Sequence, residues 1–376
     1  MDTHAKKRQI IAIIDALRPE LEAISLFLHQ NPELGGQEHQ AAQRLMEAAR
    51  QRNFTVQQKI SGYETAFIAK KGHSGPKIAF LAEYDALPGL GHACGHNLIA
   101  AMSWGAAAAF AEVAGNQAVS YLIGCPAEET SGAKVSMAND GVFDELTAAL
   151  IVHPGDANNL GGTSYASHPL QVTFRGRSAH VASKTDKGSN ALDALVMFYQ
   201  GLQQLRHTFT QENIIAGMIT KGGIAPNIVP AEAEAKFTIR ALSSHYLETT
   251  ILPAVQRLAQ GVALATGTAV ETCHYEPLFK ELLNHPKLLQ LYQNNMMLLG
   301  ETVTRLKSQD ADGSTDVGNV SHAVPTIHPD IAIGSPLTAH TPEFALAAGS
   351  PYAQERLLVG AKAMAMTAVD LLTTSL

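Results

Sequence analysis

The stretch AVSYLIGCPAEE, residues 118–129, is a continuous apolar run that ends directly in two carboxylates. The same pattern occurs in KIAFLAEYDALP (77–88), which leads to Asp85, and in AALIVHPG (148–155), which leads to His153. Short apolar runs without polar alternation are typical of strands that are buried on both faces of a parallel sheet. Because helical segments separate these runs, we expect an α/β domain with a mostly parallel sheet flanked by helices.

The pattern of the sequence changes near Ser167, where polar and apolar residues begin to alternate. PLQVTFRGRS (169–178), IIAGMITKGG (214–223) and EAEAKFTIRAL (232–242) have the period of half-buried strands, and helical segments separate them. This pattern predicts a smaller α+β domain with an antiparallel sheet, inserted at 167–279. The larger domain then comprises 1–166 and 280–376, and it ends in a helix capped by Ser350 with Pro351 at its first position.

The composition bounds the class of protein. The net charge of −7 over 376 residues, without a dense cluster of Lys and Arg, argues against nucleic acid as a partner. The most apolar run, LIAAMSWGAAAAF (98–110), is shorter than the roughly 20 residues of a membrane span, and no signal peptide is expected. Three cysteines make no disulfide framework, which favours a cytoplasmic location.

Metal-type ligands follow the apolar runs where the strands are expected to end. The carboxyl ends of parallel strands gather at one edge of a sheet, where the reactive groups of α/β proteins collect. GHACGHN (91–97) adds Cys94 and His96 after the first run, and TAHTPEF (338–344) adds His340. Each residue alone has an ordinary explanation, because single histidines and Glu pairs are common on surfaces. Their repetition after three buried runs instead predicts a metal site.

The donor set matches two four-coordinate ions. A cysteine just before a helix that begins near Leu98, with Asn97 as its N-cap, is expected to have a lowered pKa, and a thiolate can bridge two cations. A bridging sulfur and a bridging water supply two bonds each, and single bonds come from His96, Glu129, His153 and His340. Glu128 is then left beside the ions without being needed as a ligand, which suits a general base of metal-assisted hydrolysis.

With these motifs the sequence resembles the M20 metallopeptidases, in particular the amidohydrolase branch of aminoacylases, aminobenzoyl-glutamate hydrolases and auxin-conjugate hydrolases. The resemblance covers nearly the whole chain and rests on nine motifs in the expected order, NPELGGQE, AEYDALPG, GHACGHN, PAEET, IVHP, GRSAH, PNIVPAEAEAKFTIR, GSTDVGNVS and AHTPEF. It implies a catalytic domain and an inserted dimerisation or lid domain, and therefore a homodimer. It also implies two divalent ions (Zn, Mn, Co or Ni) held by Cys94, His96, Glu129, His153 and His340.

The resemblance also assigns roles to residues that do not bind metal. Glu128 is implied as the general base and acid, and Asp85 as the carboxylate that orients a ligand. His180 is implied to stabilise the tetrahedral oxyanion, in its own site or in that of the partner subunit. Asn227 and Arg240 are implied to hold the carbonyl and the carboxylate of the substrate.

The implied reaction is hydrolysis of the amide bond of a small N-acyl or N-aroyl amino acid. The chain has Asn97 where the branch often has Asp, and Thr130-Ser131-Gly132 where it often has several glycines. These departures resemble the sub-branch that contains aminobenzoyl-glutamate hydrolase and related dipeptidases. A dipeptidase or carboxypeptidase of the same fold is therefore the alternative substrate assignment.

Two hypotheses from other classes remain open. A cysteine hydrolase with Cys94 as nucleophile and His92 or His96 as base would explain GHACGHN but would leave the Glu pair, His153 and His340 without a role. A binding protein with a structural metal would need a Cys₄ or Cys₂His₂ set, which this spacing does not match. The sequence contains no phosphate loop, GxGxxG or GxSxG motif.

Overall fold

Two compact units make up the protein in a computed structural model that describes residues 2–376. Unit 1 comprises residues 2–163, 282–311 and 315–376, and unit 2 comprises Ser164–Glu281 and Asp312–Ser314. The insertion predicted at 167–279 falls within unit 2. The short segment 312–314 also belongs to unit 2, and no sequence pattern had indicated it.

The central sheet of unit 1 has six strands in the order β1-β2-β4-β3-β5-β13. They are β1 (Thr55–Ile60), β2 (Tyr63–Lys71), β3 (Lys77–Ala82), β4 (Val119–Gly124), β5 (Ala148–Leu150) and β13 (Thr326–Ile327). β4, β3, β5 and β13 pair in parallel, whereas β1 and β2 form an antiparallel edge. β3 and β4 are buried at nearly every position, which explains their continuous apolar sequences.

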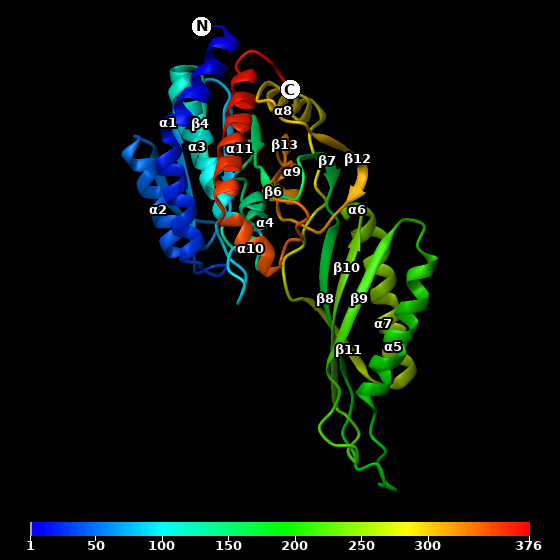
Figure 1. Ribbon diagram of the computed structural model, residues 1–376. Helices are drawn as coiled ribbons and strands as arrows, with labels where there is room; N and C mark the ends of the chain where they lie inside the picture. Colours follow the sequence, from blue (N-terminus) through cyan, green and yellow to red (C-terminus); the bar gives the residue numbers. More distant parts are fainter. Residues whose placement is uncertain (1) are drawn as a thin grey trace. The chain divides into compact units, whose positions relative to one another are not determined.

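The central helix of unit 1 is α3 (His96–Ala114), which packs between the sheet and two long helices, α1 (Thr3–Gln30) and α11 (Pro351–Asp370) (Figure 1). Glycines allow these close approaches. A Cβ on Gly105 of α3 would lie 2.8 Å from Leu21 Cδ1, and a Cβ on Gly360 of α11 would lie 2.3 Å from Met102 Sδ. The segment His96–Gln117 has the length and composition to cross a membrane, but 83% of its most apolar window is buried inside the protein. A helix that is buried to this extent belongs to the hydrophobic core of unit 1.

Shorter elements complete unit 1. The remaining helices are α2 (His39–Gln51), α4 (Ala133–Asn139), α8 (Pro286–Leu298), α9 (Val317–Ser321), α10 (Pro342–Ala348) and the 3₁₀ turn η1 (Gly115–Gln117). Two parallel strand pairs lie outside the central sheet, β6 (His153–Gly155) with β14 (Asp330–Ala332), and β7 (Asn159–Thr163) with β12 (Thr304–Ala311).

Unit 2 is an antiparallel sheet covered by helices, in the strand order β11-β8-β10-β9. The strands are β8 (Ala166–Arg175), β9 (Asn213–Lys221), β10 (Glu232–Ala241) and β11 (Ala269–His274). The helical segments are α5 (Ala191–Leu205), η2 (Arg206–Thr208), α6 (Ser244–Tyr246), η3 (Leu247–Ile251) and α7 (Leu252–Thr266). β10 alternates strictly, and its buried residues, such as Phe237, pack against Phe198 of α5. The predicted fold class is confirmed for both parts of the chain.

The two predicted helix caps have different outcomes. Ser350 caps α11 as predicted, because its Oγ accepts a hydrogen bond from Ala353 N at 3.1 Å. The prediction that Asn97 caps α3 is wrong, since the helix begins one residue earlier at His96 with Gly95 as its N-cap. Gly95 has φ +77°, a left-handed conformation that glycine adopts without steric cost. The Asn97 amide instead donates to Ser25 Oγ at 3.0 Å and ties α3 to α1.

Candidate metal centre

The ligand-type residues predicted in unit 1 lie together. Their donor atoms form three groups, and within each group all the atoms lie within 4.8 Å of one another. The groups are Cys94, His96 and His153; Cys94, Glu129 and His340; and His96, Glu128 and Glu129. Because each group shares a member with the next, the six side chains form one continuous cluster.

Each donor side chain of this cluster lies at or near the end of a helix or strand. Cys94 and His96 stand at the start of α3, and the Glu pair follows β4. His153 begins β6 directly after β5, at the same edge of the sheet. His340 precedes α10 with φ +64°, and its N–H donates to Ala93 O at 2.9 Å. This bond ties the late histidine to the loop that carries Cys94.

The donor atoms are close enough to share cations. Cys94 Sγ lies 3.3 Å from His153 Nε2, and His340 Nε2 lies 3.3 Å from Glu129 Oε1. His96 Nε2 lies 3.9 Å from the same Glu129 oxygen. Ligands of one tetrahedral ion with bonds near 2.0–2.3 Å are separated by about 3.3–3.8 Å. The observed spacing therefore suits metal coordination.

The remaining ring nitrogens are held by hydrogen bonds that turn the Nε2 atoms toward the cluster. His96 Nδ1 lies 2.9 Å from Asp85 Oδ1, and His153 Nδ1 lies 2.7 Å from Pro154 O. A bond of this kind fixes the tautomer and leaves the other nitrogen free to act as a ligand. The second oxygen of Asp85 accepts the Glu129 N–H at 2.9 Å. Asp85 thus holds one imidazole and the backbone of one carboxylate at once.

Two buried donor atoms of the cluster make no hydrogen bond in the described part of the chain, although other ligand-type atoms lie close to them. His96 Nε2 and Glu129 Oε1 make no hydrogen bond with any atom of residues 2–376. Buried polar atoms are rarely left unsatisfied, because each would cost about 1–3 kcal/mol. Thiolate, imidazole and carboxylate together suit a borderline-soft divalent ion such as Zn²⁺ or Mn²⁺. The residues present therefore fit a dinuclear site with a cation beside these atoms.

The expectation for the Cys94 thiol needs a correction. A helix N-terminus was expected to lower its pKa, but burial raises that pKa well above its usual range; His96 opposes the shift, and Glu129 and Glu128 add to it. Burial therefore favours the neutral thiol in the protein alone. A thiolate at this position needs the charge of a bound cation, which inverts the local balance.

The pKa values of two other members of the cluster are also shifted. Burial, followed by the neighbouring His96, lowers the pKa of His153 to about 4, so this imidazole is neutral and able to bind a metal. Burial raises the pKa of Glu128 well above its usual range, and Glu83, Asp316 and Glu129 contribute to the shift. Several carboxyl groups therefore lie close to Glu128. A bound divalent cation would stabilise the ionised forms of these groups.

Comparisons with known proteins identify the family. A model of the peptidase dimerisation domain matches residues 167–261, inside unit 2. Xaa-Arg dipeptidase from Mus musculus is 36% identical over 386 residues, covering 97% of this chain and 89% of the mouse protein. A p-aminobenzoyl-glutamate hydrolase polypeptide from Escherichia coli is 30% identical over 443 residues, covering 96% of this chain and 91% of its own length.

The chain belongs to the M20 metallopeptidase family. As a member it is a hydrolase that acts on amide bonds. Among solved structures, a dinuclear metal-binding M20 peptidase from Bacillus subtilis has a TM-score of 0.73 at 20% identity. That likeness covers 96% of this chain and 99% of the other and shows the shared fold.

Four residues of this M20 site were missed by the sequence analysis. Lys134 Nζ lies 2.7 Å from Glu83 Oε1 and 2.6 Å from Asp316 Oδ1, and all three side chains are buried. The other oxygen of Glu83 lies 3.5 Å from His96 Nε2. His328 packs edge-on against His153, with ring centroids 5.4 Å apart. Glu83 alone had a detectable pattern, because it lies two residues before Asp85 after the same buried strand.

The predicted substrate residues of this M20 chain lie in unit 2, at two separate places. His180 pairs with Ile228 in an isolated bridge, and Val181 N donates to Asn227 O at 3.2 Å, so His180 and Asn227 are neighbours. Arg240 lies near the opposite end of β10, where it pairs with Ser167. Eight residues of extended strand separate it from the end that leads to His180, a span of roughly 26 Å. Unit 2 therefore does not bring the three together around one small molecule.

Proposed function

We propose that this protein is a metal-dependent amidohydrolase of small N-acyl or N-aroyl amino acids, with Glu128 as its general base. Cys94, His96, Glu129, His153 and His340 would hold two divalent ions. The observation that carries the proposal is the convergence of these donors within 4.8 Å groups, with two buried donor atoms that make no hydrogen bond among residues 2–376. Glu128 belongs to the same cluster but is not needed to complete the coordination of the ions.

The roles of the side chains follow from their positions. Bound divalent ions would supply Lewis acidity, which acidifies a water molecule and polarises the amide carbonyl. Glu128 removes a proton from the attacking water and delivers it to the leaving amine. Asp85 keeps the His96 ring and the Glu129 backbone in place during this exchange. His180 donates a hydrogen bond to the oxyanion of the tetrahedral intermediate.

The relatives support a substrate that ends in an amino acid. The names of the two relatives, Xaa-Arg dipeptidase and p-aminobenzoyl-glutamate hydrolase, describe amides of arginine and of glutamate. We therefore assign a free α-carboxylate to the substrate of this chain, with the Arg240 guanidinium as its bidentate partner. An N-aroyl glutamate and a dipeptide share that carboxylate, so a dipeptidase is the second candidate, favoured by the higher identity to the mouse protein.

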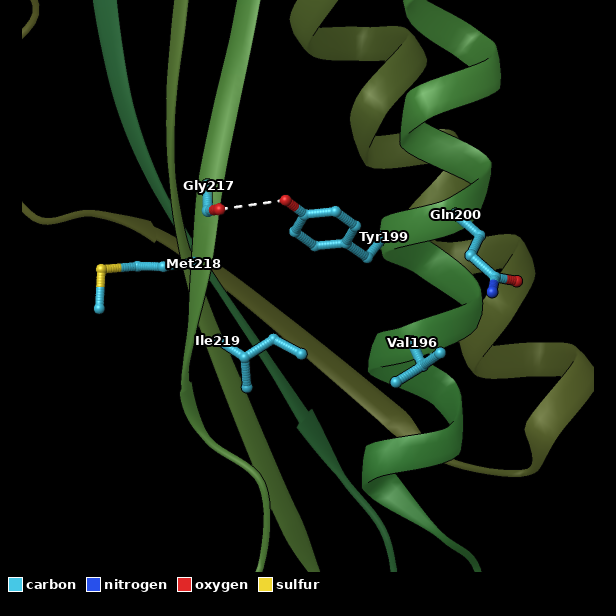
Figure 2. Close-up of a pocket in the computed structure, with 6 residues that line it drawn as sticks. All are labelled: Val196, Tyr199, Gln200, Gly217, Met218 and Ile219. Carbon is cyan, nitrogen blue, oxygen red and sulfur yellow. Dashed lines mark hydrogen bonds between the residues drawn. The ribbon is translucent and has the colours of Figure 1, made fainter.

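A homodimer through unit 2 is part of the proposal. β9 is an edge strand, and beside it a groove of about 390 Å³ is lined by Val196, Tyr199, Gln200, Gly217, Met218 and Ile219 (Figure 2). Three of the apolar side chains that line it are exposed, Met218 at 64%, Ile219 at 43% and Val196 at 40%, and a group of exposed apolar side chains of this kind marks an interaction surface. We assign a second copy of this chain to the edge, because the matched dimerisation domain contains both β9 and α5.

A shared site would explain the separation of the substrate residues. Arg240 lies roughly 26 Å from the end of β10 that leads to His180, which is too far for one small substrate to reach both. A dimer would supply a second copy of His180 and Asn227 to complete such a site. We therefore assign His180 to the partner's site and Arg240 to the site of its own subunit.

The test is turnover by the metal-reconstituted protein on a panel of N-acyl, N-aroyl and dipeptide amides, with wild type and Glu128→Gln compared. The variant should bind two ions per chain as wild type does and should lose kcat by about 10³-fold or more. Near-normal turnover by Glu128→Gln would show that the general-base assignment is wrong. Activity that survives exhaustive chelation but is abolished by a thiol alkylator would favour the cysteine hydrolase instead.

A further inference from the structure

The segment Asn31–Glu38, which carries the motif NPELGGQE, has no role in the chemistry proposed above, yet it touches both loops that carry the site. Leu34 forms a bridge with Ala86, next to Asp85. On its other side the segment lies against the residues that follow β4. A Cβ on Gly35 would lie 2.3 Å from Thr130 Oγ1 and 3.1 Å from Ala127 Cα. Only glycine fits this approach.

The Glu38 carboxylate ends this segment, and it is fully buried with three hydrogen-bond donors around it. Oε1 accepts the Ala127 N–H at 2.8 Å and the Gly36 N–H at 2.8 Å, and Oε2 accepts the Thr65 hydroxyl at 2.9 Å. The side chain therefore joins three separate stretches of unit 1. Burial raises the pKa of the Glu38 carboxyl above its ordinary value, although the hydrogen bonds from Gly36 and Thr65 oppose the shift.

Ala127 has an unusual backbone. It is a non-glycine residue with φ +60°, and it directly precedes the Glu pair. The left-handed conformation costs a residue with a Cβ about 1–2 kcal/mol, so it persists only where the surroundings impose it. Ala127 O accepts the N–H of Gly132 at 2.7 Å, and Glu129 N donates to Asp85. The turn is therefore fastened on both sides of Glu128.

We propose that Glu38 is a positioning residue that holds Ala127 in its left-handed conformation and thereby directs Glu128 and Glu129 into the cluster. The inference rests on the roles proposed for that Glu pair. Without the carboxylate, the Ala127 N–H would be buried and unpaired, and the backbone would relax toward negative φ. A rotation at Ala127 would redirect both glutamates, because they are the next two residues.

The neighbouring Glu33 offers a matched control. It lies on the same segment, and its carboxylate accepts the N–H of Gln40 at 2.9 Å and of Ala41 at 3.0 Å, in the first turn of α2. Its side chain therefore supports the start of a helix and makes no hydrogen bond to the turn at Ala127. A general loosening of the segment would follow from changes at either glutamate, whereas the positioning role belongs to Glu38 alone.

The experiment compares Glu38→Gln with Glu38→Asp, and makes the same changes at Glu33. In Glu38→Gln the amide oxygen can still accept both N–H groups, and the amide nitrogen can donate to Thr65 Oγ1. In Glu38→Asp the charge remains, but the oxygens retreat by about 1.5 Å and lose Ala127. We expect Asp to lower kcat about tenfold with KM within about twofold, and Gln to stay within about twofold of wild type. The Glu33 variants should keep kcat.

A second measurement is independent of turnover. Amide hydrogen exchange in the metal-loaded protein should become faster at residues 127–130 in Glu38→Asp, and at the start of α2 in Glu33→Asp. If exchange at 127–130 is unchanged, or if Gln impairs kcat more than Asp does, the positioning role is overturned. If Glu128→Gln retains full turnover, the proposed function fails, while the exchange data still decide whether Glu38 holds the turn.

Discussion

Replacing Lys134 by methionine should unfold this protein far more readily than its position outside the cluster would suggest. The Lys134 ammonium contacts Glu83 at 2.7 Å and Asp316 at 2.6 Å, and each of the three side chains is at most 1% exposed. Methionine fills a similar volume but leaves two buried carboxylates without their cation. Removing one partner of a buried ion pair costs about 3–5 kcal/mol, a large share of the roughly 5–15 kcal/mol that stabilises a typical protein.

The charges of the three residues sharpen this prediction. Two carboxylates and one ammonium sum to −1, so Asp316→Asn leaves a balanced pair of Lys134 and Glu83. The asparagine oxygen can still accept the Lys134 N–H, which now donates to Asp316 Oδ2 at 3.0 Å. Burial raises the pKa of Asp316 to about 6 although Lys134 opposes the shift, so its ionised form is already costly. The asparagine amide nitrogen would face the Lys134 ammonium, but that ammonium keeps Glu83 as its partner, so we expect Asp316→Asn to lower the free energy of unfolding by less than Lys134→Met does.

The assay is urea unfolding at pH 7 with and without added metal, followed by tryptophan fluorescence of the buried Trp104. The order of stability should be wild type, then Asp316→Asn, then Lys134→Met, with the largest loss in the variant that leaves two buried carboxylates without their cation. A Lys134→Met protein within about 1 kcal/mol of wild type would refute the reasoning. Equal losses in the two variants would also refute it, because the argument depends on the excess of negative charge.

Further predictions concern the rest of the molecule. The Arg356 guanidinium holds the pKa of Glu301 below its usual range by hydrogen bonding, so the pair stabilises fully above pH ~4.5 and loses this contribution as the pH falls through the folded pKa. Glu301→Gln should therefore cost about 2 kcal/mol in urea unfolding at pH 7 and progressively less toward pH ~3. Mixing inactive His180→Ala and Arg240→Ala subunits should restore about one quarter of wild-type turnover if His180 acts in the partner's site, and none if it acts in its own. Met218→Lys should dissociate the dimer in sedimentation analysis, because it places a charge on the edge strand.

The parts of the fold that sequence predicts best are those set by local patterns. Unbroken apolar runs indicate strands covered on both faces, and strict alternation in EAEAKFTIRA indicates β10 of a half-buried sheet. The antiparallel edge formed by β1 and β2 was not predicted, because pairing direction depends on partners that a single strand does not specify. For the same reason, the return of residues 312–314 to unit 2 left no trace in the sequence.

The residues of the candidate site also fall into two groups, those that a local sequence pattern predicts and those that meet only in the folded chain. Cys94, His96 and His153 were predicted because each follows a buried run, and Glu128 because it stands beside a ligand-type residue. Lys134 and Asp316 lie 182 residues apart and meet only in the folded chain, so no spacing rule connects them. The expectation that the Cys94 thiol has a lowered pKa was wrong for a related reason. Proximity to a helix N-terminus can be inferred from sequence, but the extent of burial that opposes it cannot.

The charges around the cluster bear on which of the competing chemistries is viable. The cluster contains the carboxyl groups of Glu128 and Glu129, and four more lie around it, those of Glu38, Glu83, Asp85 and Asp316. Lys134 offsets one of these charges by pairing with Glu83 and Asp316. A nucleophilic thiolate needs a positive field; His96 favours the ionised form of Cys94, but burial, the largest effect, outweighs it together with Glu129 and Glu128 and raises the pKa of the thiol. Divalent cations would balance the same carboxylates and draw the thiolate in as a ligand. The charge distribution therefore supports metal-assisted hydrolysis over a cysteine nucleophile.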